Sequence, residues 1–530
     1  MDLNTLWFIL VGVVLFIFGI ENFSSEIQRG AGSWLNNILK KATKNRWYGA
    51  FFGFLTTALV NSSTATTLIA VGLVNAGLIS FAQSLPLIFG ANIGSTITAQ
   101  LIAFKITRYA FIFLIFGFVL SFFRKTKFVG KSLFYFGLVF FAFNLISEAV
   151  APFSKDPEVI KIFYSYNNFY LLILIGFLFT AIVNSSALTL GTIIVLAFNG
   201  FFGLNEAFPL ILGANLGTTL TSFVASFRMD LHAKRVAFSH ILFNVLGVFL
   251  IIPFSMPFLK FIVFLGGDIG RQVANAHLFF NLFVALFFLF LLNPFKRIIE
   301  VLVRGNEEEI VLTPKYLTGE KIPEKKSEVF SLVEKELKYA MEINEKILIY
   351  SKEYLTKGEE KTLRKLEKLC RLSNVVTSKI GETLFKFSVR KLTDEEAKKV
   401  LYLIRLVNAS EQLGDLAGDL AFLPEKLREK NLPQRADIKK ISLLFDLSID
   451  LLKKINSGFP RGLDKKEFNR LHSDKIVKLL DKQYSSNIDE LKKEDYSEGS
   501  FFVEASSILE EILFKIREIT LLCNDLSKLE

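Results

Sequence analysis

The tripeptide Asn-Ser-Ser occurs twice, at 61–63 and 184–186, each time inside an apolar stretch. Hydroxyl and amide groups cost free energy in hydrocarbon unless they are hydrogen-bonded, so such a cluster faces a cavity or a neighbouring helix. Ser hydroxyls and helix-end N–H groups can hold a tetrahedral oxyanion without a buried positive charge. The candidate anion-binding residues are Asn61, Ser62, Ser63, Asn184, Ser185 and Ser186.

Further Thr, Ser and Asn residues follow each tripeptide and recur in the next apolar segment. Their oxygens beside an unwound helix suit a small hard cation such as Na⁺, which would offset the charge of the anion. The cores of these segments lack Asp and Glu, which argues against a carboxylate proton relay. The alternative is that Ser and Thr only allow close helix packing. The candidate cation ligands are Thr64, Thr66, Thr67, Asn92, Ser95, Thr96, Thr189, Asn215, Thr218 and Thr219.

The two tripeptides belong to an internal repeat with an offset of 123 residues. From Gly53 to Thr67, ten of fifteen residues are identical to those 123 positions later. The same offset relates Gly90-Ala-Asn-Ile-Gly-Ser-Thr to Gly213-Ala-Asn-Leu-Gly-Thr-Thr. Because the matched positions are largely polar or Gly, similar apolar composition does not explain the match.

The segments that hold the tripeptides, 49–79 and 168–199, are too long for one membrane-spanning helix. Each would form a helix of about 45 Å, whereas the hydrocarbon core is about 30 Å thick. Two half-helices that meet at the polar tripeptide, forming a re-entrant hairpin, fit better. The half-helix that begins there would point free N–H groups and its positive dipole end at a bound anion.

Charged residues divide the chain into two parts. Residues 1–303 carry 20 of the 62 Lys and Arg and 10 of the 51 Asp and Glu, whereas the rest is dense in charges of both signs. We therefore predict a membrane domain at 1–303, a linker at 304–326 and a soluble helical bundle at 327–530. The fold class predicted is all-α.

Basic residues indicate the orientation of the membrane domain. With 296–297 cytoplasmic and both hairpins re-entrant, fourteen Lys and Arg fall inside and six outside, as the positive-inside rule requires. The repeats, at about 49–150 and 168–293, are then inverted, which suits a transporter that alternates between inward- and outward-facing states. We interpret the apolar run 6–20 as a retained first span in the plasma (inner) membrane and the soluble domain as cytoplasmic.

The doubled Val-Asn-Ser-Ser and Gly-Ala-Asn-x-Gly-(Ser/Thr)-Thr motifs resemble the signature of the type II sodium–phosphate cotransporter family, over about residues 5–295. The resemblance implies sodium-dependent transport of inorganic phosphate, with Na⁺ as the coupling ion and no organic cofactor. It also implies phosphate contacts from the tip serines Ser62, Ser63, Ser185 and Ser186.

The chain departs from the family pattern at both tripeptides. Asn61 and Asn184 stand in place of the usual Gln, which shortens the amide side chain. Thr64 and Ala187 replace a third Ser. Leu190 stands where the first repeat has Thr67, so a hydroxyl is absent from the second repeat.

Long amphipathic stretches in 327–530, rich in Leu, Glu and Lys, predict helices and resemble PhoU-type domains, which are often fused to this family. Acidic residues at i, i+4 and i+8 share one helix face there. Because PhoU-type domains bind metal clusters through such acids, the resemblance implies a metal site at Glu411, Asp415 and Asp419. The alternative is a solvated acidic face.

His240 and Asn244, and likewise His277 and Asn281, are spaced i, i+4 on predicted spans. We expect these pairs to join two helices of the second repeat by hydrogen bonds, and a role in ion or proton binding is the alternative.

Three functions are consistent with the sequence: sodium-coupled phosphate uptake, export of phosphate or another oxyanion, and phosphate sensing without transport. An enzyme is not indicated, because the membrane part has no nucleotide motif, buried carboxylate pair or Cys/His nucleophile. The expected partners are inorganic phosphate, sodium and the lipid bilayer, with no nucleic acid. The helical bundle is a candidate surface for a regulatory protein or for self-association.

Overall fold

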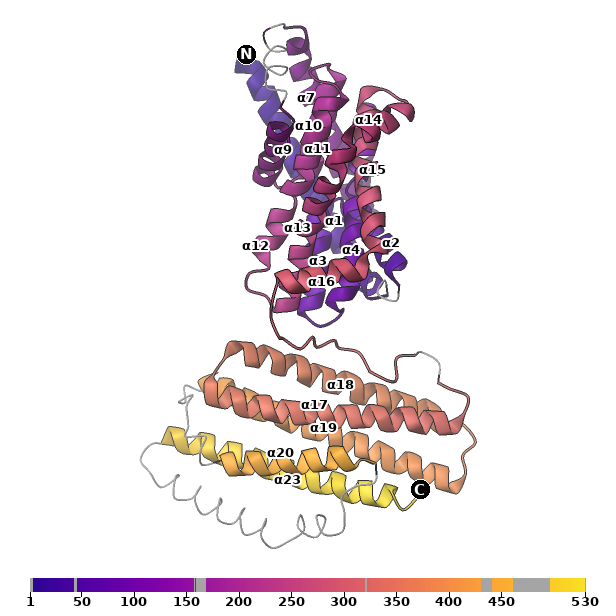
Figure 1. Cartoon of the computed structure of the whole chain (residues 1–530), viewed down its shortest axis with the longest axis vertical. Helices are drawn as coiled ribbons and strands as arrows, with labels where there is room; N and C mark the ends of the chain where they lie inside the picture. Colours follow the sequence, from indigo (N-terminus) through magenta and orange to yellow (C-terminus); the bar gives the residue numbers. More distant parts are fainter. Residues whose placement is uncertain are drawn as a thin grey trace. The chain divides into compact units, whose positions relative to one another are not determined.

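The computed structural model describes residues 3–41, 45–156, 158, 168–319, 322–429, 441–460 and 496–529. Over these residues the chain is helical and has no β-strand, which confirms the all-α prediction. It divides into two compact units, Met1–Glu309 and Ile310–Glu530 (Figure 1).

The first unit has helical segments long and apolar enough to cross a membrane. Six such segments lie in the described part of the chain, and they confirm a multi-pass membrane protein. These segments are Thr5–Ile27, Phe81–Ala103, Lys127–Phe153, Leu204–Ala225, Leu231–Phe264 and Ile269–Phe290.

Neither segment that holds a tripeptide is one continuous helix. In the first repeat α2 (Arg46–Val60) ends at Asn61 and α3 (Ser63–Asn75) begins after Ser62. In the second repeat, α9 (Phe169–Val183) and α10 (Ser186–Phe198) are separated at the matching position. Both described segments therefore consist of two helices separated at the tripeptide, and neither is one continuous helix.

Each broken hairpin packs against a second interrupted pair of helices. α2 lies on α4 (Phe81–Gly94), which continues as α5 (Ile97–Ala103), and α9 lies on α11 (Leu204–Gly217), which continues as α12 (Thr219–Ala225). A Cβ atom added to Gly90 would lie 1.8 Å from the carbonyl oxygen of Ala50, and one added to Gly213 would lie 2.0 Å from that of Ile173. The helices of each pair therefore touch through their backbones, which only glycine allows.

Other helices of this unit pack against these hairpins. A cluster of phenylalanines joins α4 to α13, α15 and α16: Phe89 stacks on Phe243 at 4.9 Å, and Phe295 contacts both Phe89 and Phe288. The other elements of this unit are α1 (Leu3–Lys41), η2 (Ile106–Tyr109), α6 (Ala110–Ser121), α7 (Lys127–Val150), η3 (Ala151–Lys155), α13 (Leu231–Ile251), η4 (Ile252–Phe254), α14 (Ser255–Phe264), α15 (Ile269–Phe290) and α16 (Leu292–Leu302).

The second unit is a bundle of long amphipathic helices. A buried polar network fixes their register, because Asn344 donates to the Ser410 carbonyl oxygen at 2.6 Å and accepts from the Ser373 hydroxyl at 2.8 Å. Two parts of the predicted bundle, 430–440 and 461–495, lie outside the described residues. The described helices are α17 (Lys326–Lys357), α18 (Glu360–Ser388), α19 (Asp394–Glu429), α20 (Ser442–Gly458) and α23 (Tyr496–Leu526).

Candidate functional site

The two tripeptides, 123 residues apart in sequence, line one cavity of about 380 Å³. All six predicted anion-binding residues lie on its wall, together with Thr64 and Ala187. One face of α1 completes the lining. The structure thus brings together the two halves of the predicted anion site.

Backbone geometry explains why each helix breaks where it does. Asn61 has φ +57° and Asn184 has φ +54°, in the left-handed region that Asn tolerates better than most residues. The next residue, Ser62 or Ser185, is extended and caps the following helix. An Asn-Ser pair is therefore a local helix stop followed by a helix start.

The capping serines leave hydrogen-bond donors available at each helix break. Ser62 Oγ accepts from the N–H of Ala65 at 3.1 Å, and Ser185 Oγ accepts from that of Leu188 at 3.3 Å. A hydroxyl that accepts a bond still has its own proton to donate. The N–H groups of Ser63 and Thr64 are the first two of α3 and, as at any helix start, lack an intrahelical acceptor. Each break therefore offers several neutral donors and the positive end of a helix dipole.

The amide groups of the tripeptides are held at one end. Asn61 Oδ1 accepts from the hydroxyl of Thr98 on α5, and Asn184 Oδ1 accepts from that of Thr221 on α12. Since the oxygen end is engaged, the Nδ2 end is the one left to donate.

Two predicted cation ligands instead close the hairpins. Thr66 shares a hydroxyl–hydroxyl hydrogen bond of 2.8 Å with Thr57, and Thr189 shares one of 2.7 Å with Thr180. Both bonds join the two arms of a hairpin directly behind its break. The same donor set thus recurs at the same offset as the sequence repeat.

The other predicted cation ligands lie outside the lining of the cavity, since only Thr64 of the ten candidates lines it. Asn92 Oδ1 accepts from Asn244 at 3.2 Å, while Asn215 Oδ1 lies 3.4 Å from both Asn281 Nδ2 and His277 Nε2. Four hydroxyls donate to carbonyl oxygens of their own chain segment at the α4–α5 and α11–α12 interruptions: Ser95, Thr96, Thr218 and Thr219.

The expectation that the His/Asn pairs join two helices within the second repeat is corrected in part. Asn244 of α13 reaches Asn92 of the first repeat, whereas His240 Nδ1 lies 3.3 Å from Ser222 Oγ of the second repeat. Asn281 and His277 of α15 do contact the second repeat, at Asn215.

Some buried oxygens have no hydrogen-bond partner among the described residues. Thr67 Oγ1, Asn244 Oδ1 and Asn281 Oδ1 are such atoms. A buried oxygen without a donor is costly unless a cation or water meets it. Their chemistry suits a small hard cation.

Sequence reasoning missed the contribution of α1. Glu21, Ser24 and Ser25 line the cavity and are spaced i, i+3 and i+4, which places them on one helix face. The signal that could have indicated this contribution was the i, i+3, i+4 spacing of these polar residues near the end of the first apolar span.

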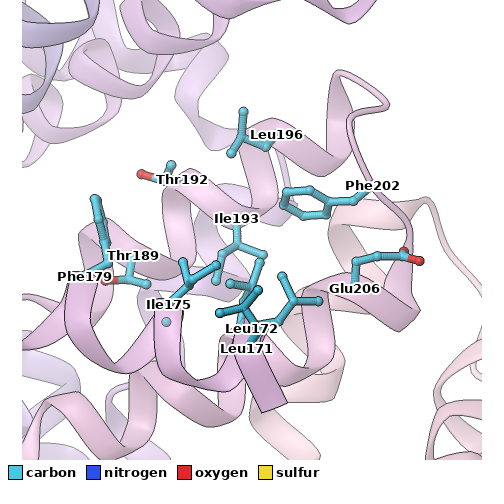
Figure 2. A pocket seen from close by; sticks show the side chains of 12 residues that line it. Leu171, Leu172, Ile175, Phe179, Thr189, Thr192, Ile193, Leu196, Phe202 and Glu206 are labelled. Atoms are coloured by element: carbon cyan, nitrogen blue, oxygen red, sulfur yellow. The ribbon is translucent and has the colours of Figure 1, made fainter. Parts of the chain in front are cut away.

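A second, larger cavity of about 560 Å³ lies among α9, α10 and α11. Figure 2 shows its wall of Leu, Ile and Phe side chains, with Thr189 and Thr192 on one side and Glu206 at the far end. Such a wall offers few donors for an oxyanion, so the smaller cavity is the candidate site.

The predicted metal site in the soluble bundle finds no support. Across the described residues, no group of three or more His, Cys, Asp or Glu could hold a metal ion. Partial burial, and then the neighbouring Asp419, raise the pKa of Asp415.

Some known proteins match the membrane unit, and others match nearly the whole chain. The family model described as Na⁺/Pi-cotransporter matches residues 15–148 and 161–257. "Uncharacterized protein YqeW" of Bacillus subtilis is 32% identical over 294 residues, 55% of this chain and 96% of that protein. "Putative inorganic phosphate export protein YjbB" of Escherichia coli is 25% identical over 516 residues, 95% of this chain and 93% of that protein.

A mammalian protein matches over a shorter region. "Sodium-dependent phosphate transport protein 2B" of Rattus norvegicus is 33% identical over 129 residues, 24% of this chain and 18% of that protein. No solved structure matches the chain significantly.

Proposed function

The chain belongs to the Na⁺/Pi-cotransporter family, and from this premise we propose that it moves inorganic phosphate across the membrane with Na⁺ as the coupling ion. The observation that carries the proposal is the convergence of both Asn-Ser-Ser tripeptides on one cavity. Phosphate is tetrahedral and carries one to two negative charges near neutral pH, so it accepts hydrogen bonds from several directions. The tip serines, the first N–H groups of α3 and α10 and the Asn amides supply such donors from two sides.

The charges around the cavity support the proposed coupling to sodium. Among the described lining residues the cavity has no Lys, Arg or His, so donors and helix dipoles alone would balance the phosphate charge. A co-bound small cation would lower the cost of taking the anion out of water. The unpaired oxygens of Thr67, Asn244 and Asn281 do not line this cavity, and each is a candidate ligand for a small cation outside it.

Alternating access is supported by the matched hydrogen bonds. Thr57–Thr66 and Thr180–Thr189, like Thr98–Asn61 and Thr221–Asn184, are related by the offset of 123 residues. Two hairpins built alike can exchange conformations, which would carry the cavity from one side of the membrane to the other. In this scheme 1–303 is the transport domain, 304–326 a linker, and 327–530 a cytoplasmic regulatory bundle of PhoU-like type.

Export is the second candidate. The relative named for phosphate export aligns along nearly the whole chain, including both units, whereas the relative named for sodium-dependent transport aligns with a short region. Phosphate-loaded cells distinguish the two directions: faster loss of labelled phosphate on expression of the chain supports export.

The test of the proposed function is flux of labelled phosphate in proteoliposomes with a sodium gradient or a choline gradient. Ser63→Ala and Ser186→Ala should each weaken apparent phosphate affinity by about 1–3 kcal/mol, because each removes a charge-assisted hydrogen bond. Ser84→Ala is the matched control, since Ser84 is buried but donates to the Phe81 carbonyl oxygen outside the cavity. Unchanged affinity in both tip variants would remove these hydroxyls from the site.

A further inference from the structure

The face that α1 presents to the phosphate cavity contains a carboxylate. α1 lies outside both repeats and contacts α2 of the first and α10 of the second. It contributes Glu21, Ser24 and Ser25 to the lining. Among the described residues that line the cavity, Glu21 is the one with an ionisable side chain.

The Glu21 carboxylate differs from the next acid along the same helix. Glu26 pairs with Lys131 at 3.3 Å and with Arg29 at 3.7 Å. No Lys, Arg or His of the described chain lies within salt-bridge distance of Glu21. One acid of α1 is thus neutralised by protein groups, and the other faces the cavity without a basic partner.

An ionised carboxylate and a phosphate ion in one cavity of about 380 Å³ repel each other. This repulsion opposes phosphate binding unless a positive charge enters with the anion. Carboxylate and hydroxyl oxygens are hard ligands that suit a small monovalent cation better than they suit a second anion.

We propose that Glu21, with hydroxyl oxygens of Ser24 and Ser25, forms a sodium site inside the phosphate cavity. This inference rests on the proposed function and adds a ligand set that comes from outside the repeats. The bound Na⁺ neutralises the carboxylate, and phosphate then enters beside a cation rather than beside an anion.

The experiment compares wild type, Glu21→Gln and Glu26→Gln in proteoliposomes, with ²²Na and labelled phosphate counted together. Glu21→Gln should move fewer sodium ions per phosphate, and its phosphate affinity in choline should rise about tenfold because the repulsion is gone. Glu26→Gln is matched in helix and chemistry but lies beside Lys131, so it should keep the wild-type ratio.

Several results would overturn the proposal. The first is that wild type transports phosphate together with sodium and Glu21→Gln moves the same number of sodium ions per phosphate as wild type. Another is wild-type phosphate affinity that is equal in sodium and choline and rises as pH falls, because a proton would then be the neutralising ion. If Glu21→Gln fails to fold, Glu21→Asp serves instead: the ratio should stay and the sodium concentration for half-maximal flux should rise. Absence of phosphate flux in wild type would be a failure of the proposed function.

Discussion

The helix breaks of the two repeats have the same backbone conformation but differ in their side chains. Both have a left-handed Asn, a capping Ser and a Thr–Thr bond behind the break. The first break adds two hydroxyls that the second lacks: Thr64 corresponds to Ala187 and Thr67 to Leu190.

These extra hydroxyls have different surroundings. Thr64 Oγ1 lies 3.4 Å from the carbonyl oxygen of Thr218, so it reaches from the first repeat to the second. Thr67 Oγ1 is buried without a partner among the described residues, whereas Leu190 is a buried apolar side chain. The candidate anion site is therefore built alike from both repeats, whereas the proposed cation ligands differ between them.

The largest expected effect comes from disrupting the close backbone contact between helices that both repeats share. Gly90→Ala and Gly213→Ala should each lower stability by about 1–3 kcal/mol or prevent folding, because the new Cβ would overlap a backbone oxygen of α2 or α9. Thermal unfolding in detergent, followed by size exclusion, measures the loss.

Gly72→Ala in α3 is the control, since no atom lies within 4 Å of its added Cβ and Ala favours a helix. A tolerated Gly213→Ala beside a damaging Gly90→Ala would mean that the two repeats are not packed alike.

The next largest expected effect tests whether the two breaks differ in their contribution to sodium binding. Thr67→Val keeps the shape of the side chain and removes the unpaired oxygen, so the sodium concentration for half-maximal phosphate flux should rise about tenfold if one ligand worth about 1.4 kcal/mol is lost. The corresponding substitution Leu190→Val removes no oxygen and should leave sodium dependence unchanged. Equal sodium dependence in both variants would exclude Thr67 as a ligand.

The smallest effect concerns the threonines that orient the Asn side chains. Thr98→Val and Thr221→Val each remove the bond to Asn61 or Asn184, at a cost of about 0.5–1.5 kcal/mol in phosphate affinity. Thr98 is buried and Thr221 is partly exposed to water, so the first substitution should cost more. Binding titrations of the two purified variants give the order, and a larger loss in Thr221→Val would contradict this account.

Local chemistry explains most of what could be predicted about the fold. The break at each Asn-Ser pair follows from residue preferences for a left-handed stop and an N-cap, and the long apolar segments specify the membrane helices. The offset of 123 residues also relates the Thr57–Thr66 bond to the Thr180–Thr189 bond, although the sequence did not show that these bonds would form. Thr66 and Thr189 were nevertheless expected to be cation ligands, because sequence does not show which hydroxyls find a neighbour across a hairpin.

The amino-acid sequence alone determined the two helix breaks, their donors and the all-helical, multi-pass class, because each depends on neighbouring residues or on segment length. Only the tertiary structure decided that both breaks meet at one cavity, that Asn92 and Asn215 lie behind it with partners on α13 and α15, and that Glu21 faces it. Those contacts join residues far apart in the chain, and their geometry depends on how whole helices pack against one another.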